Sequence, residues 1–144
     1  YWDLLKKFQP ELYEGIDVQE SLRNRMRVWW HGDTELPENY YRLASMFFCA
    51  ESITQHLERF NQTCHSFVQS LVPGGYFTAA FMENSSGWEV SGHRYPAVAV
   101  DADIVSGVFE KWSDDAVVEH IPVADAPLRS GYTGMVFVTG TRKY

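Results

Sequence analysis

The feature that most constrains the fold is a pair of apolar segments with an amphipathic segment between them. Residues 43–49 and 76–82 are nearly continuous apolar runs, which predict strands covered on both faces, as in a parallel sheet. Between them, apolar residues recur at helical spacing and polar residues occupy the opposite side. The apolar positions are Leu57, Phe60, Cys64, Phe67, Val68 and Leu71. A strand, a helix and a strand joined by tight turns predict a right-handed βαβ unit.

The ends of the central helix are predicted from residue types that start or stop helices. Ser52 and Gln55 are candidates to cap its start. Pro73-Gly74-Gly75 is expected to end it, because proline cannot continue a helix and glycine favours the conformation that closes one. We therefore expect the second strand to begin only after this turn.

The region before this unit also has helix and strand patterns. Asp17 followed by Glu20 has the form of a capping box and predicts a short helix through about Arg25. A short strand is expected at 27–30. The chain begins at Tyr1 within a helical pattern, which suggests a partial chain.

The region after the unit continues the alternation of strands and helices. Residues 84–92 are polar and rich in turn formers, which predicts a hairpin or flap. Asp101 is expected to cap a helix, and strands are predicted at 116–123 and 134–139. The whole pattern predicts one α/β domain over residues 1–144, with a twisted and mostly parallel sheet.

Composition limits the classes of partner. The formal net charge is −7 and the pI is near 5.1, so the chain lacks the basic surface that nucleic acid or an anionic membrane requires. No apolar run is long enough to span a membrane. The two cysteines, Cys49 and Cys64, form no CxxC pair and no zinc-ligand pattern with the histidines, so no metal is assigned. Two thiols in apolar contexts are typical of a reduced, cytoplasmic protein.

Three segments, in order, resemble class I S-adenosylmethionine-dependent methyltransferases. The first is Gly32-Asp33 after a strand, with the stretch that leads into the apolar run at 43–49. The second is Leu71-Val72-Pro73-Gly74-Gly75, similar to the turn before the fifth strand of that class. The third is the pair of strands at 116–123 and 134–139, which resembles its final antiparallel hairpin. The resemblance implies a Rossmann-like sheet whose last strand is antiparallel.

Shorter matches indicate a subgroup of that class. Residues 46–52, 81–85 and 92–96 resemble bacterial relatives of the nicotinamide, phenylethanolamine and thioether methyltransferase family. In that family the segment after the fifth strand folds over the acceptor. The resemblance implies transfer of a methyl group from S-adenosylmethionine to a nitrogen, sulfur or oxygen of a small molecule.

The chain departs from the class at its beginning. The glycine-rich loop that approaches the cofactor is absent, as is the acidic residue that binds the ribose. In the strand order of the class, 3-2-1-4-5-7-6, the strand at 43–49 then has an open edge, which invites pairing with another chain. We expect an N-terminal half from the parent polypeptide or a second chain, or a homo-oligomer. The alternative is a non-catalytic remnant that serves as an interaction subunit. A dehydrogenase half is disfavoured, because it too needs the glycine fingerprint.

The resemblance implies cofactor contacts on two sides. Asp33 and Thr34 would lie beside the adenine, although Asp33 could simply cap a turn. Phe48, Cys49, Ala50 and Glu51 would lie beside the methionine part, at the carboxyl end of a strand where α/β sheets bind ligands. The first three could equally be core, as Phe47 is expected to be, and Glu51 could instead cap the next helix.

The acceptor site is expected after the next strand. Glu83 could orient or deprotonate an acceptor, with Asn84 beside it. His93 is a candidate general base from the flap, or alternatively a surface residue. Trp88 and Tyr95 could form the walls of an aromatic pocket for a cation, or pack the flap onto the sheet.

Overall fold

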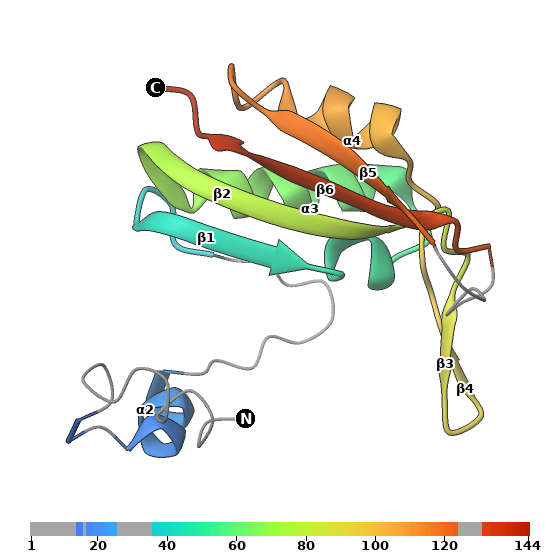
Figure 1. The fold of residues 1–144 in the computed structure, drawn as a ribbon, viewed down its shortest axis with the longest axis horizontal. Coiled ribbons are helices and arrows are strands. Elements are labelled where there is room, and N and C mark those ends of the chain that lie inside the picture. The colour runs from blue at the N-terminus through green and yellow to red at the C-terminus, as the bar shows by residue number, and fades with distance from the viewer. Residues whose placement is uncertain (1–13, 16, 26–35, 124–130) are drawn as a thin grey trace. The chain divides into compact units, whose positions relative to one another are not determined.

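The structure is a computed structural model that describes residues 14–15, 17–25, 36–123 and 131–144 (Figure 1). The chain divides into two units, residues 1–30 and 31–144. In the first unit, α2 spans Val18–Arg25, and the Asp17 carboxylate accepts a hydrogen bond of 2.9 Å from the Glu20 amide. The capping prediction is therefore confirmed. The strand expected at 27–30 lies outside the described residues.

The second unit is built on a four-stranded sheet in the order β1-β2-β6-β5. β1 and β2 are parallel, whereas β6 is antiparallel to both of its neighbours, β2 and β5. The bounds are Tyr41–Phe47 for β1, Leu71–Glu83 for β2, Val117–Pro122 for β5 and Gly134–Thr141 for β6. β1, β2 and β5 therefore point the same way and β6 is reversed, as the sequence predicts.

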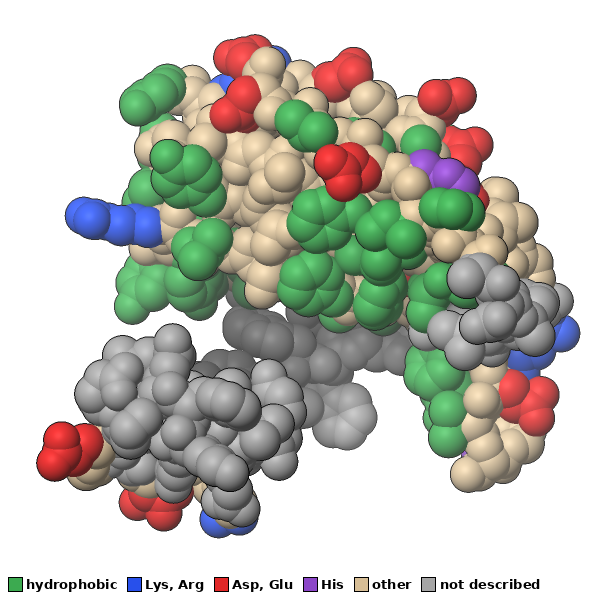
Figure 2. Space-filling view, viewed as in Figure 1, with side chains coloured by type: hydrophobic (Ala, Val, Ile, Leu, Met, Phe, Trp, Pro, Cys, Tyr) green, Lys and Arg blue, Asp and Glu red, His purple; other side chains and the backbone are tan. Residues whose placement is uncertain are grey.

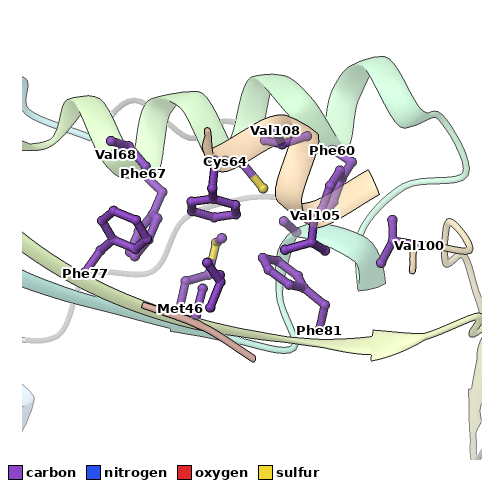
Figure 3. Close-up of a cluster of buried hydrophobic side chains, with 14 of the residues drawn as sticks. Met46, Phe60, Cys64, Phe67, Val68, Phe77, Phe81, Val100, Val105 and Val108 are labelled. Carbon is purple, nitrogen blue, oxygen red and sulfur yellow. The ribbon is translucent and has the colours of Figure 1, made fainter. Parts of the chain in front are cut away.

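Two helices, α3 (Leu57–Gln69) and α4 (Ala102–Phe109), lie along one face of the sheet (Figure 1). The core fills the space between them and the strands (Figure 3). On β2, Phe77 and Phe81 point into this core, where they meet aromatic side chains of both helices. The Asp101 carboxylate accepts a hydrogen bond of 2.8 Å from the Ile104 amide, which confirms the predicted cap of α4. No described helix is long and apolar enough to cross a membrane.

The predicted ends of α3 are wrong. The helix starts after His56, which makes no side-chain cap bond, and neither Ser52 nor Gln55 caps it. At its other end the helix stops at Gln69 and β2 begins at once, so that Pro73-Gly74-Gly75 lies within the strand. The guanidinium of Arg142 donates to the carbonyls of Gln69 and Leu71 and so holds the junction between α3 and β2.

The second face of the sheet carries apolar side chains that the described residues leave exposed. Leu43 is 69% exposed and Phe47 is 48% exposed, so for β1 the predictions of burial on both faces and of Phe47 as core are wrong. In β2, residues 79–82 are buried on both faces, as predicted. Because cross-strand partners share a face, Tyr76 lies beside Leu43 on this side. Figure 2 shows apolar side chains gathered over the strands here. β1 pairs only with β2 in the described sheet, so its other edge is open, as expected.

Candidate functional site

The carboxyl ends of the three co-directional strands lie at one edge of the sheet. β1 ends at Phe47, β2 at Glu83 and β5 at Pro122, while β6 begins there at Gly134. Open α/β sheets bind ligands outside the carboxyl ends of their strands. We call this edge the rim. The predicted site residues of the described region lie on the segments that leave it.

Phe48 and Cys49 lie at the rim directly after β1. Phe48 has a positive φ of 56°, a conformation that non-glycine residues seldom adopt, and its amide donates to the Ala80 carbonyl at 2.8 Å. It is partly exposed, and Cys49 is exposed. Burial of the thiol, followed by the charge of Glu51, raises the pKa of Cys49. A raised pKa disfavours the reactive thiolate, so nothing marks Cys49 as an activated nucleophile.

Ala50 and Glu51 begin a single 3-10 turn, η2 (Ala50–Ser52), and both are fully buried. Neither side chain reaches the surface of the described residues, so the predicted contact of these two side chains with the cofactor stays a prediction that their burial does not favour. Glu51 Oε1 instead accepts hydrogen bonds from the Met82 amide at 3.3 Å and from the Ser52 hydroxyl at 2.9 Å. This carboxylate joins the end of β1 to the end of β2, which is a structural role.

Glu83 and Asn84 belong to a polar cluster that spans three strands. Glu83 Oε2 lies 3.0 Å from His120 Nε2, and the Thr133 hydroxyl donates to the same oxygen. The Asn84 amide group donates to the Thr133 hydroxyl at 3.0 Å. Gly134 lies in the middle of the cluster. We call the three side chains of Glu83, His120 and Thr133 the rim triad.

The predicted flap is a hairpin of β3 (Trp88–Val90) and β4 (His93–Tyr95). The rings of Trp88 and Tyr95 stack at its base, with centroids 4.2 Å apart. Trp88 Nε1 donates to the Ser52 carbonyl at 3.1 Å, which fastens the base beside η2. His93 is opposite Val90 next to the two-residue turn, exposed at the far end of the hairpin. Among the described residues, His93 makes no contact with Glu83.

Asp33 and Thr34, predicted on the adenine side, lie outside the described residues. Within the ranges that the structure describes, no group of three His, Cys, Asp or Glu side chains is arranged to hold a metal ion.

Sequence reasoning missed His120 and Thr133 as site residues. The available signal was the alternation in the predicted strand at 116–123, which puts His120 on the same face as Val118, toward the helices. A histidine at an inward position near a strand end, followed by a strand that starts with Gly134, marks a polar side chain with room beside it. The distance to Glu83 depends on the strand order and could not be inferred.

No protein-family model and no curated protein matches the sequence. Among solved structures, the chain is similar to a SAM-dependent methyltransferase from Methanosarcina mazei, at 12% identity and a TM-score of 0.56, over 81% of this chain and 66% of that one. A Listeria monocytogenes protein assigned to the same class matches at 7% identity and a TM-score of 0.54, over 88% and 76%. A possible exported protein from Bordetella parapertussis matches at 11% identity and 0.56, over 93% and 48%.

These likenesses define the fold and its extent. The chain has the Rossmann-like fold of the class I methyltransferases, with a mixed sheet in which β6 is reversed between β2 and β5. It spans 66% of the length of the Methanosarcina chain and about half that of the Bordetella chain, at 48%. Identities of this size indicate a shared fold, and activity has to be argued from the site.

Proposed function

We propose that the chain is part of a class I methyltransferase that transfers a methyl group from S-adenosylmethionine to a nitrogen, sulfur or oxygen of a small molecule. The observation that carries this proposal is the strand order β1-β2-β6-β5 with β6 reversed. It corresponds to the 4-5-7-6 end of the strand order expected from the sequence. Membership of the nicotinamide, phenylethanolamine and thioether subgroup is a further part of the proposal, supported by the sequence segments alone.

The rim offers separate places for cofactor and acceptor. Phe48 and Cys49 are accessible after β1 and are proposed to contact the methylene groups of the methionine part, whereas the Glu51 side chain is buried. Asp33 and Thr34 are proposed for the adenine on the sequence resemblance. When bound, S-adenosylmethionine supplies an electrophilic methyl group on a sulfonium. The chain's own task is to place the acceptor in line with that group.

The acceptor would lie near Glu83 and Asn84, under the hairpin that begins at Trp88. The stacked Trp88 and Tyr95 rings offer an aromatic surface at the hairpin base, where a cationic amine or sulfonium is favoured. His93 is also proposed to contact the acceptor, if the hairpin moves over it. Its place near the hairpin turn means that it needs a movement of the hairpin to reach Glu83.

The open edge of β1 is proposed as the attachment site for the N-terminal half of the fold, which carries the glycine-rich loop. A shallow groove runs along this edge, lined by residues that include Leu36, Leu43, Ala44 and Phe67. An added strand would satisfy the unpaired backbone groups of β1 and cover this apolar lining. The half could belong to the same polypeptide or to another chain, and pairing between copies of this chain is the competing outcome. The free thiols Cys49 and Cys64 accord with a reducing, cytoplasmic setting, which is also a proposal.

Calorimetric titration with S-adenosylhomocysteine, together with the mass in solution, tests this function. Saturable binding supports a methyltransferase and justifies a screen of acceptors. Phe48→Ala should weaken that binding, whereas Val90→Ala, at an exposed hairpin position, should not. A well-folded protein that ignores the ligand, alone and with a supplied N-terminal half, would favour the non-catalytic interaction subunit. The burial of Ala50 and Glu51, two residues predicted to contact the cofactor, is the observation that favours the non-catalytic interaction subunit.

A further inference from the structure

The contact between Glu83 and His120 crosses an entire strand. Glu83 is on β2 and His120 on β5, with β6 between them. Neighbouring strands are about 4.8 Å apart, so these two backbones are separated by roughly 9.6 Å. The side chains nevertheless meet at 3.0 Å, over Gly134. A Cβ at residue 134 would lie 2.7 Å from His120 Nε2 and 3.3 Å from Glu83 Oε2. The contact therefore depends on a glycine in the middle strand.

The hydrogen bonds of the rim triad fix the tautomer of the imidazole. The side-chain amide of Asn84 donates a hydrogen bond to the Thr133 hydroxyl oxygen. The hydroxyl in turn donates its own proton to Glu83 Oε2. That oxygen is thus an acceptor, and His120 Nε2 has to be the donor in the contact at 3.0 Å. The lone pair of the neutral ring is then on Nδ1.

The two members of the pair differ in access to solvent. The His120 side chain is 44% exposed, and the Glu83 side chain only 12%. Nδ1 of His120 has no hydrogen-bond partner among the described residues. A sheltered carboxylate that holds one ring nitrogen of a half-exposed imidazole, with no described partner on the other nitrogen, is the arrangement by which enzymes orient a histidine base.

We infer that His120 is the general base of the proposed methyl transfer and that Glu83 and Thr133 position it. The inference rests on the proposed function and narrows its acceptor to a group that loses a proton when methylated, namely a primary or secondary amine, a hydroxyl or a thiol. It also changes the role of Glu83 from the predicted base to a positioning residue.

The reaction balances without any further reactant. The acceptor atom forms a bond to the methyl carbon, and the bond from that carbon to sulfur breaks with its electron pair left on sulfur. The sulfonium becomes a neutral thioether. The acceptor's proton passes to His120 Nδ1, and the resulting imidazolium is stabilised by the Glu83 carboxylate across the 3.0 Å contact.

The first test needs neither cofactor nor acceptor. Diethyl pyrocarbonate acylates an unprotonated imidazole nitrogen, and mass spectrometry of peptides measures the rate at each histidine. With labelling done well above the ordinary histidine pKa of about 6.5, we expect His120 to be labelled and its rate to fall several-fold in Glu83→Gln, because the carboxylate no longer polarises the ring. His93, exposed on the hairpin, is the internal control and should keep its rate. An unreactive His120, or one labelled equally in both proteins, would overturn the inference.

The second test uses the assembly that binds S-adenosylhomocysteine and compares two kinds of acceptor. A phenol or secondary amine has a proton to lose, whereas a thioether has none. His120→Gln should reduce kcat for the first kind by roughly 100-fold more than for the second, with KM little changed. Glu119→Gln, on the opposite face of β5, is the matched control. Equal losses for both kinds would refute the base.

The two proposals can fail separately. Absence of cofactor binding refutes the proposed function and the reaction assigned to His120. Equal labelling in the wild type and Glu83→Gln refutes the polarised histidine whether or not the cofactor binds.

Discussion

Gly134→Ala is the substitution whose effect most directly reports the geometry of the rim triad. An alanine in place of a strand glycine normally stabilises a protein by about 0.4–1 kcal/mol, because it restricts the unfolded chain. Here the new Cβ would lie 2.7 Å from His120 Nε2 and 2.7 Å from the Ile121 carbonyl oxygen. The imidazole can rotate away from the methyl group, but the carbonyl belongs to the backbone of β5 and cannot.

The steric cost should outweigh the gain. Overpacking of a well-filled site costs roughly 1–3 kcal/mol, so the net loss of unfolding free energy is expected to be about 1–2 kcal/mol. Urea denaturation followed by circular dichroism measures it. Gly107→Ala is the matched control, since a Cβ at Gly107 meets nothing within 4 Å. Within helix α4, that change should stabilise the protein by roughly 0.5–1 kcal/mol.

A double mutant separates the two clashes. In a His120→Ala background, the cost of Gly134→Ala should fall but not vanish, because the Ile121 carbonyl remains. A coupling of about 0.5–3 kcal/mol is usual for residues in contact. A Gly134→Ala protein as stable as the wild type, or more stable, would show that β5 and β6 are not in the register described.

Three further outcomes follow from buried or hydrogen-bonded groups. Phe81→Ala, at a fully buried ring, should cost about 3–5 kcal/mol of unfolding free energy in urea, and a loss below 1 kcal/mol would contradict the core packing. Hydrogen bonds, the backbone amide of Thr141 first, lower the pKa of Asp115. The stability that the ionised Asp115 carboxylate contributes should be complete above its unfolded pKa of about 3.9 and be lost as the pH falls through its lower folded pKa. Asp115→Asn should therefore make the unfolding free energy depend less steeply on pH in acid. Iodoacetamide should modify exposed Cys49 well before Cys64, whose burial raises its pKa; equal rates by mass spectrometry would contradict this.

The sequence predicted the fold where local pattern and tertiary packing agree. The helical spacing of Leu57 to Leu71 identified α3, and the apolar runs identified β1 and β2. The C-terminal end of α3 was mispredicted because distant contacts hold the junction between the helix and β2. Arg142, from the last segment of the chain, donates to the carbonyls of Gln69 and Leu71 on either side of that junction. The residue types at Pro73-Gly74-Gly75 cannot predict a contact with a residue so far along the chain.

The sequence predicted which segments lie at the rim but not which of their side chains face outward. The order of strands placed residues 48–51 and 83–84 at one rim, because parallel strands bring their carboxyl ends together. Which of those side chains faces outward depends on tertiary packing, and Glu51 turned inward to bind the Met82 amide. The rim triad also depends on the strand order and on the β5-β6 register, which local patterns do not show even where they mark an inward His120 and a glycine at 134.

The open edge and the proposed cofactor contacts belong to the same strand. β1 ends at Phe47, and the accessible Phe48 and Cys49 follow directly. A strand that paired with the free edge of β1 in parallel would end at the same rim, beside these two residues. Pairing would therefore cover exposed apolar side chains such as Leu43 and also supply the second wall of the cofactor site. On the proposed function, assembly of the sheet and binding of the cofactor are coupled, so that each should strengthen the other.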